Sequence, residues 1–279
     1  MIKNIVFDFG GVIAPLSREQ AVKAFERIGL ADANERLDQC HQQGIFQDLE
    51  EGRLTEGEFH KKLEELCHRS LTEEEIQSAW MGFFVGVNPE WLRELTALKE
   101  RGFRLLLLSN TNPYVMRWAC SPSLSSDGKG LTDYFDKLYL SYQIGYTKPD
   151  ARIFEYLLAD SGILPQETLF IDDGKANAEM GKKLGMLTLN PRQRSACGSR
   201  SGTSERNFGV WYHRRSACAV GTRRILASDH GCGARENSVL SGPSFLRADY
   251  PGSGDFFQCP WVSGTDERCR ISDRKDKRY

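Results

Sequence analysis

The chain has 279 residues, of which 40% are hydrophobic and 27% are charged, and its formal net charge at pH 7 is −1. This length is enough to bury a real hydrophobic core in one large or two small domains. No apolar run approaches the roughly 20 residues that would cross a bilayer. No charged leader with an apolar segment precedes the first apolar run, so we expect neither a membrane span nor a signal peptide.

The near-neutral charge hides an asymmetry between two parts of the chain. Residues 1–191 carry 21 Lys and Arg against 29 Asp and Glu, whereas residues 192–279 carry 16 against 9. An acidic body argues against nucleic acid as the partner of the folded part. Cys40, Cys67 and Cys120 are scattered through this body without the spacing of a metal site. This pattern indicates reduced thiols and a cytoplasmic location.

The first apolar run of the sequence ends on a carboxylate. Residues 2–7 have the length and the β-branched content of a buried strand, and Asp8 follows them directly. Gly10 and Gly11 then predict a tight turn. Asp8 is therefore expected at the carboxyl end of a strand, which is where open α/β sheets place their chemistry.

Three later apolar runs are also followed by polar groups. These are residues 103–108 with Ser109 and Asn110, residues 138–140 with Lys148, and residues 168–171 with Asp172 and Asp173. Because helical patterns separate the runs, we predict an α/β fold, a Rossmann-like parallel sheet with helices on both faces. Parallel strands bring their carboxyl ends to one edge of the sheet, so the polar groups are expected in one site.

The pattern between the first strand and residue 88 is helical throughout. Three pairs have the spacing of a capping box, in which side chains satisfy the free amides at a helix start: Ser17 with Gln20, Thr55 with Glu58, and Thr72 with Glu75. A plain crossover helix is the alternative, but it needs only about 10–15 residues. We therefore predict an inserted helical cap over residues 14–87 and a core over residues 1–13 and 88–191. Such a lid can exclude water and select substrate.

Residues 192–279 differ in character from the rest of the chain. They contain 14 Arg against 2 Lys and five of the eight cysteines, without a sustained period of 2 or 3.6. This mixture is typical of a coding sequence read out of frame. A disordered extension and a small folded module are the alternatives. We expect this tail to be disordered or poorly packed, and dispensable for the site.

The order of these groups resembles the haloacid dehalogenase superfamily of phosphohydrolases over residues 1–191. Five stretches carry the resemblance: residues 7–12, 50–52, 108–112, 139–149 and 170–177. The chain is most similar to the sugar-phosphate phosphatases with a small helical cap, such as bacterial alpha-D-glucose-1-phosphate phosphatase. The resemblance implies a Mg²⁺-dependent phosphomonoester hydrolase that acts on a small phosphorylated metabolite, with a sugar phosphate favoured.

The resemblance also implies a role for each group. Asp8 would attack phosphorus and form an aspartyl-phosphate, which splits a difficult hydrolysis into two easier steps. Lys148 would be the second catalytic residue, supplying a fixed positive charge. The residues expected to bind phosphate or substrate are Phe9, Gly10, Gly11, Ser109, Asn110, Lys148 and Glu50. The expected ligands of Mg²⁺ are Asp8, the main-chain carbonyl of Gly10, and one or both of Asp172 and Asp173.

One position departs from the pattern of the superfamily. Many of its phosphatases have a second Asp two residues after the nucleophile, which serves as acid for the leaving alcohol and as base for water. Here that residue is Gly10, which has no side chain to protonate anything. The proton donor is therefore unassigned. A non-catalytic or regulatory protein that keeps the phosphate and metal site is the alternative function.

Each of these residues alone has an ordinary structural role. A strand-end Asp is often a turn residue, Ser and Asn cap helices, a lysine is commonly solvated, and acidic pairs face helix starts. Glu50 could equally be a solvated helix-end carboxylate. Their shared position at successive strand ends favours a site.

Two other classes of protein use similar groups. A metal-free dehalogenase would not need the acidic pair, and a receiver domain carries its acidic pair before the phosphorylated Asp. The expected partner is a small phosphate ester, without a membrane, and the chain could be a monomer or a dimer.

Overall fold

The structure is a computed structural model, and it describes residues 1–37 and 42–191. All of the described residues belong to one compact unit. The predicted tail over residues 192–279 therefore lies outside the described residues. Among the described residues, no helix is both long enough and apolar enough to cross a membrane.

In the described part of the chain, five parallel strands form the central sheet. They are β1 (Asn4–Phe7), β2 (Arg104–Ser109), β3 (Lys137–Leu140), β4 (Thr168–Ile171) and β5 (Leu187–Leu189). Their order in the sheet is β3-β2-β1-β4-β5, so β1 is the central strand. The chain builds outward from β1 to β3 on one side and then returns to add β4 and β5 on the other. Such a reversal opens a crevice at the carboxyl end of the central strand, and Asp8 directly follows β1.

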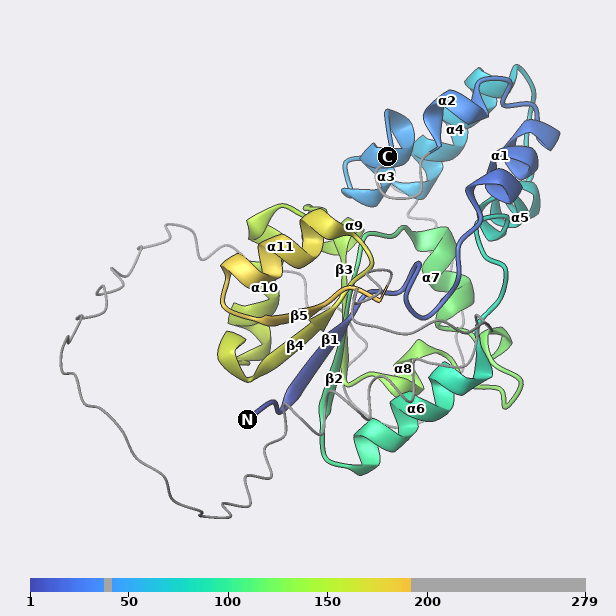
Figure 1. Ribbon diagram of the computed structural model, residues 1–279. Coiled ribbons are helices and arrows are strands. Elements are labelled where there is room, and N and C mark those ends of the chain that lie inside the picture. Colours follow the sequence, from blue (N-terminus) through green and yellow to red (C-terminus); the bar gives the residue numbers. More distant parts are fainter. Residues whose placement is uncertain (38–41, 192–279) are drawn as a thin grey trace, which may run out of the picture. The chain divides into compact units, whose positions relative to one another are not determined.

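Helices cover both faces of this sheet, as Figure 1 shows. One face packs on α6 (Pro89–Glu100), α7 (Pro113–Ala119) and α8 (Leu131–Tyr134), and the other packs on α10 (Ala151–Ser161) and α11 (Lys175–Lys183). Alternate residues of each strand divide between two buried clusters: Ile5 and Phe7 of β1 belong to the first, and Val6 belongs to the second. Both clusters are apolar, which is why the strands read as continuous hydrophobic runs. The predicted fold class is confirmed.

Short elements connect the larger ones. They are α9 (Ser141–Ile144) and the 3₁₀ turns η1 (Pro122–Leu124) and η2 (Pro165–Glu167). Each is too short to show a period in the sequence, so none was predicted. The apolar runs predicted as strands at residues 2–7, 103–108, 138–140 and 168–171 agree with β1, β2, β3 and β4 within two residues at each end. Asn88 caps α6, since its side chain accepts a hydrogen bond from the Glu90 amide at 2.9 Å.

Among the described residues, five helices precede α6. They are α1 (Arg18–Arg27), α2 (Ala33–Arg36), α3 (Ile45–Glu50), α4 (Glu56–Cys67) and α5 (Glu73–Met81). Phe25, Phe46, Phe59 and Trp80 form their buried aromatic centre, with ring centroids 5.2–6.0 Å apart. Rings of this size bury large apolar areas, so they bind the helices into one cluster. The boundaries predicted for the cap stay a prediction.

The predicted capping boxes have different outcomes. At α4 and α5 both reciprocal hydrogen bonds are present, between Thr55 and Glu58 and between Thr72 and Glu75. At α1 the Ser17 side chain accepts from the amide three residues later, at 3.3 Å, so a simple cap is present. The two full boxes fix where α4 and α5 begin.

One arginine on α7 holds the starts of both capped helices. Arg117 lies 2.5 Å from a Glu56 oxygen on α4 and 2.8 Å from a Glu73 oxygen on α5. Gln77 of α5 also donates a hydrogen bond to the Tyr114 carbonyl at 2.9 Å. These contacts attach the helices inserted after β1 to the α/β core beside the sheet edge.

Candidate active site

Lys148 is the centre of a buried polar cluster at the carboxyl edge of the sheet. Its ammonium nitrogen lies 2.9 Å from Asp8 Oδ1 and 2.7 Å from Asp172 Oδ2. It also donates a hydrogen bond to the Leu108 carbonyl at 2.8 Å. Only 1% of the lysine is exposed. The three acceptors match the three protons of an ammonium group, so a buried lysine is fully satisfied here.

Asn110 holds the backbone of this lysine in place. Its side-chain nitrogen donates to the Lys148 carbonyl at 2.9 Å, and its side-chain oxygen accepts from the Lys148 amide at 2.7 Å. One residue further on, the Thr111 amide donates to the Ser141 hydroxyl at 2.9 Å. The loops after β2 and β3 are thereby tied together, which carries Lys148 from the end of β3 back to the central strand.

Three carboxylates converge beside the lysine. One oxygen from each of Asp8, Asp172 and Asp173 lies within 4.8 Å of the others. Asp172 is completely buried and its two oxygens have partners, since Oδ1 accepts from the Gly174 amide at 2.7 Å and Oδ2 accepts from Lys148. Asn177 donates to both oxygens, at 3.0 and 3.2 Å. Carboxylate oxygens are the ligands that Mg²⁺ prefers, so the donor set fits that ion.

The turn after β1, at Gly10 and Gly11, leaves room for the Asp173 carboxylate. Gly11 has φ of +76°, and a methyl group added to it would lie 2.1 Å from Asp173 Oδ2. A side chain is therefore excluded at Gly11 both by its backbone conformation and by the neighbouring carboxylate.

Changing Gly11 should separate backbone strain from loss of the metal site. Gly11→Ala forces a left-handed alanine, which costs about 1–2 kcal/mol, and also displaces Asp173. Gly128→Ala is a matched control, because Gly128 has φ of +74° with no heavy atom within 4 Å of the added methyl. We expect both variants to lower the free energy of unfolding in urea, and only Gly11→Ala to weaken Mg²⁺ binding in calorimetric titration. Equal Mg²⁺ affinity in the two variants would contradict the position assigned to Asp173.

Burial and neighbouring charges shift the pKa values of this cluster. Burial raises the pKa of Asp8 to about 7; Lys148 opposes the shift, and the charges of Asp172 and Asp173 add to it. Burial alone would lower the pKa of Lys148, but Asp172 and Asp8 together outweigh it and the net shift is upward. The lysine is thus charged at neutral pH, whereas the carboxylates repel one another until a further cation joins them.

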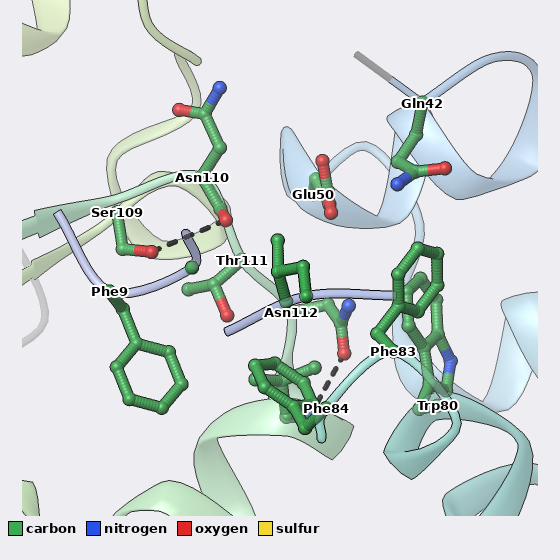
Figure 2. A pocket seen from close by; sticks show the side chains of 13 residues that line it. Phe9, Gln42, Glu50, Trp80, Phe83, Phe84, Ser109, Asn110, Thr111 and Asn112 are labelled. Atoms are coloured by element: carbon green, nitrogen blue, oxygen red, sulfur yellow. Dashed lines mark hydrogen bonds between the residues drawn. The ribbon is translucent and has the colours of Figure 1, made fainter. Parts of the chain in front are cut away.

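A cavity of about 210 Å³ opens over this cluster. Its walls include Asp8, Lys148 and Asp173 from the core, and Glu50 from α3. A smaller pocket shares Glu50 and Asn110 with it. Figure 2 shows that pocket, with Glu50 on one side and the loop from Ser109 to Asn112 on the other. The inserted helices therefore provide one wall of the cavity and the strand ends provide its floor.

The predicted site residues are distributed over this region as follows. The larger cavity is lined by Asp8, Gly10, Glu50, Asn110, Lys148 and Asp173, and the smaller pocket by Phe9 and Ser109. Gly11 lies against Asp173, and Asp172 contacts Lys148. The Phe9 amide donates to Asp8 Oδ1 at 2.7 Å, and the Gly11 amide donates to the Ala14 carbonyl at 2.9 Å. Their predicted roles toward phosphate, like those of the other site residues, stay predictions.

Three polar residues of the cavity wall were not predicted: Gln42, Lys175 and Asn177. Asn177 lies inside the motif stretch at residues 170–177, five positions after Asp172, so its spacing could have indicated a supporting role. Gln42 comes from an irregular segment before α3, and no pattern in the sequence marks it.

Comparison with known proteins agrees with this geometry. Residues 2–185 match the family of haloacid dehalogenase-like hydrolases. The chain belongs to the haloacid dehalogenase-like hydrolases. It is also 56% identical over 191 residues to a D-ribitol-5-phosphate phosphatase of Bacteroides thetaiotaomicron. This match covers 68% of the chain and 92% of that protein.

Solved structures of this family are similar to the chain as well. A predicted HAD-like family hydrolase from Porphyromonas gingivalis is 44% identical, with a TM-score of 0.65 over 68% of this chain and 91% of that one. A HAD family enzyme from Bacteroides thetaiotaomicron, in complex with magnesium and inorganic phosphate, is 34% identical. Its TM-score is 0.64 over 70% of this chain and 98% of that one. The predictions of a HAD-family phosphatase and of Mg²⁺ as its cofactor are confirmed, and the non-catalytic alternative is not favoured.

Proposed function

We propose that this HAD-family phosphatase hydrolyses the phosphate ester of a small polyol or sugar through an aspartyl-phosphate on Asp8. The observation that best supports this proposal is the contact of Lys148 with both Asp8 and Asp172, in a buried cluster that also includes Asp173. A carboxylate can attack a phosphate monoester only when the repulsion between the two anions is neutralised. The relative that hydrolyses D-ribitol 5-phosphate supports the class of substrate.

In this proposal each core residue has one task. Asp8 supplies the attacking oxygen. Lys148, held at 2.9 Å from that carboxylate, neutralises the phosphoryl oxygens as they approach it. The Ser109 hydroxyl, at the end of β2, donates a hydrogen bond to one of those oxygens, in place of its present contact with the Asn110 carbonyl at 3.3 Å.

The two carboxylates after β4 have different tasks in this proposal. Asp172 already accepts hydrogen bonds at both oxygens from Lys148, Gly174 and Asn177, so it orients the lysine. Asp173 and Asp8, together with the Gly10 carbonyl, would hold Mg²⁺. The bound ion would neutralise the phosphoryl charge and keep Asp8 ionised despite its raised pKa.

The size of the cavity favours small substrates. About 210 Å³ lies over the cluster, and the inserted helices form its outer wall. Binding sites for larger, drug-sized ligands are typically about 300–1,000 Å³. A five-carbon polyol phosphate is therefore a better candidate than a nucleotide, whose base would need further space. An anomeric sugar phosphate is also included, because its better leaving group lessens the need for an acid.

A panel of phosphate esters tests this proposal. The full chain is assayed for phosphate release from D-ribitol 5-phosphate, alpha-D-glucose 1-phosphate and a nucleoside monophosphate, with Mg²⁺ and with excess chelator. We expect the highest kcat/KM for a polyol or sugar phosphate, and loss of turnover in chelator that Mg²⁺ restores. Absence of hydrolysis for every ester would favour the non-catalytic alternative, and turnover in chelator would contradict the role of the metal.

The cysteines support a reducing compartment for this reaction. Cys67 and Cys120 are free thiols among the described residues. Burial raises the pKa of Cys67 and raises that of Cys120 to about 11, so both thiols are unreactive at neutral pH. We therefore propose a cytoplasmic location, where small phosphorylated metabolites are available as substrates.

A further inference from the structure

The position that carries the second Asp in many related phosphatases is a glycine here, and the Leu16 side chain lies against it. A methyl group added to Gly10 would lie 2.9 Å from Leu16 Cδ1 and 3.5 Å from Leu16 Cγ. Leu16 also lines the cavity over Asp8. An acid at residue 10 would therefore need Leu16 to move, and the leaving oxygen has no proton donor on this side of the nucleophile.

A carboxyl group from α3 lines the same cavity. Glu50 is the last residue of α3, and it borders both the cavity over Asp8 and the pocket beside it. In Figure 2 its side chain lies between Asn110 and Gln42 on the side of the inserted helices. Within the described part of the chain, no hydrogen bond or ion pair is found for its carboxyl group, although the residue is only half-exposed. A group placed in this way is available to a bound ester.

We propose that Glu50 is the general acid and base of the reaction, supplied by the inserted helices because Gly10 cannot supply it. This inference rests on the proposed function, in which Asp8 is the nucleophile. It assigns Glu50 a catalytic role in addition to the substrate contact predicted from the sequence.

Protons and electron pairs balance over two steps. In the first, an Asp8 oxygen bonds to phosphorus while the bond from phosphorus to the ester oxygen breaks. That oxygen keeps the electron pair and takes the proton of Glu50, leaving as an alcohol. In the second, Glu50 takes a proton from water as the water oxygen bonds to phosphorus. The bond to Asp8 breaks, inorganic phosphate is released, and both carboxyl groups return to their first states.

The charges around Glu50 suit this role. Burial and the charge of Asp8 raise its pKa to about 8, against the opposing effect of Lys148. The charged groups that line the cavity with it are Asp8, Lys148, Asp173 and Lys175. A neutral carboxyl group is therefore available as a donor near pH 7, and it becomes a stronger base once the proton has left.

Leaving-group dependence tests the proposal in the full chain with Mg²⁺. An alkyl ester needs protonation of its oxygen, whereas p-nitrophenyl phosphate does not, because p-nitrophenolate is a stable anion. For Glu50→Gln we expect kcat/KM to fall about 10²–10⁴-fold on the alkyl phosphate that the wild type hydrolyses best. On p-nitrophenyl phosphate we expect kcat/KM to fall less than about tenfold. Because the second step also slows, one equivalent of p-nitrophenolate should appear in a burst.

Two further variants control this experiment. Asp48→Asn makes the same change on the same helix, at a carboxylate that pairs with Arg53 at 2.7 Å and does not line the cavity. It should match the wild type on both substrates. Glu50→Ala removes the group without adding an amide and should repeat the selective loss. Circular dichroism on each variant shows that the fold is kept.

The pH dependence of kcat/KM tests the role of Glu50 independently. The acid form of Glu50 is the active one, so the wild-type kcat/KM on the alkyl ester should fall as pH rises through about 8. This fall should be absent in Glu50→Gln. Equal losses on the alkyl and aryl esters, or no loss on either, would overturn the role of Glu50 while leaving the phosphatase function standing. A wild type inactive on both esters would instead overturn the proposed function, and this inference with it.

Discussion

Asp8→Asn is expected to abolish Mg²⁺-dependent phosphatase activity while the fold is kept. The amide cannot attack phosphorus, so kcat should fall by about 10⁴-fold or more on every substrate, aryl esters included. The fold should tolerate the change for an electrostatic reason. Since the pKa of Asp8 is raised to about 7, its ionised form is disfavoured in the folded state, and this penalty grows as pH rises toward neutrality. In the variant, Lys148 would still have its ion pair with Asp172, whose Oδ2 lies 2.7 Å from the lysine nitrogen.

Steady-state kinetics and thermal unfolding measure this prediction. The unfolding temperature of Asp8→Asn should lie within about 4 °C of the wild type, which corresponds to about 1 kcal/mol or less in a chain of this size. Asp127→Asn is the matched control, because that side chain is 53% exposed and pairs with Lys129 on a surface loop. Activity of Asp8→Asn within tenfold of the wild type, with an unchanged circular dichroism spectrum, would remove Asp8 from the mechanism.

The two neighbouring carboxylates after β4 should respond differently to the same substitution. Asp172 is completely buried and paired with Lys148, so Asp172→Asn removes one partner of a buried ion pair. Such a loss typically lowers the free energy of unfolding by about 3 kcal/mol. Asp173 is only partly buried; it lies against Gly11 and lines the cavity over Asp8, where we propose that Mg²⁺ binds. Asp173→Asn should therefore weaken Mg²⁺ binding about 100-fold or more, with little loss of stability.

Urea unfolding without metal and calorimetric titration with Mg²⁺ separate the two effects. Each variant serves as the control for the other, since the change in charge and size is identical. The reverse result, with Mg²⁺ binding lost in Asp172→Asn and stability lost in Asp173→Asn, would exchange the two roles. Equal effects of both substitutions on Mg²⁺ affinity would mean that both carboxylates are direct ligands.

The local sequence determined the elements and the order of the polar groups. The run at residues 2–7 and the repeating apolar runs predict parallel strands, because a strand buried on both faces must be apolar at every position. Thr55 and Thr72 mark the starts of α4 and α5, because a capping box depends on residues only three apart. The place of Asp8 at a strand end follows directly from these patterns, since it adjoins the strand in the chain.

The assembly of the site was decided by tertiary structure. Lys148 lies eight residues after the end of β3, and it reaches Asp8 and Asp172 because Asn110 binds its backbone through two hydrogen bonds. Glu50 comes to the cavity through the packing of α3, which no period in the sequence specifies. Periodicity and capping act over a few neighbouring residues, whereas these contacts join loops 24 or more residues apart. The sequence by itself therefore determined which groups are present, and only packing decided which of them meet and which carboxylate supports the lysine.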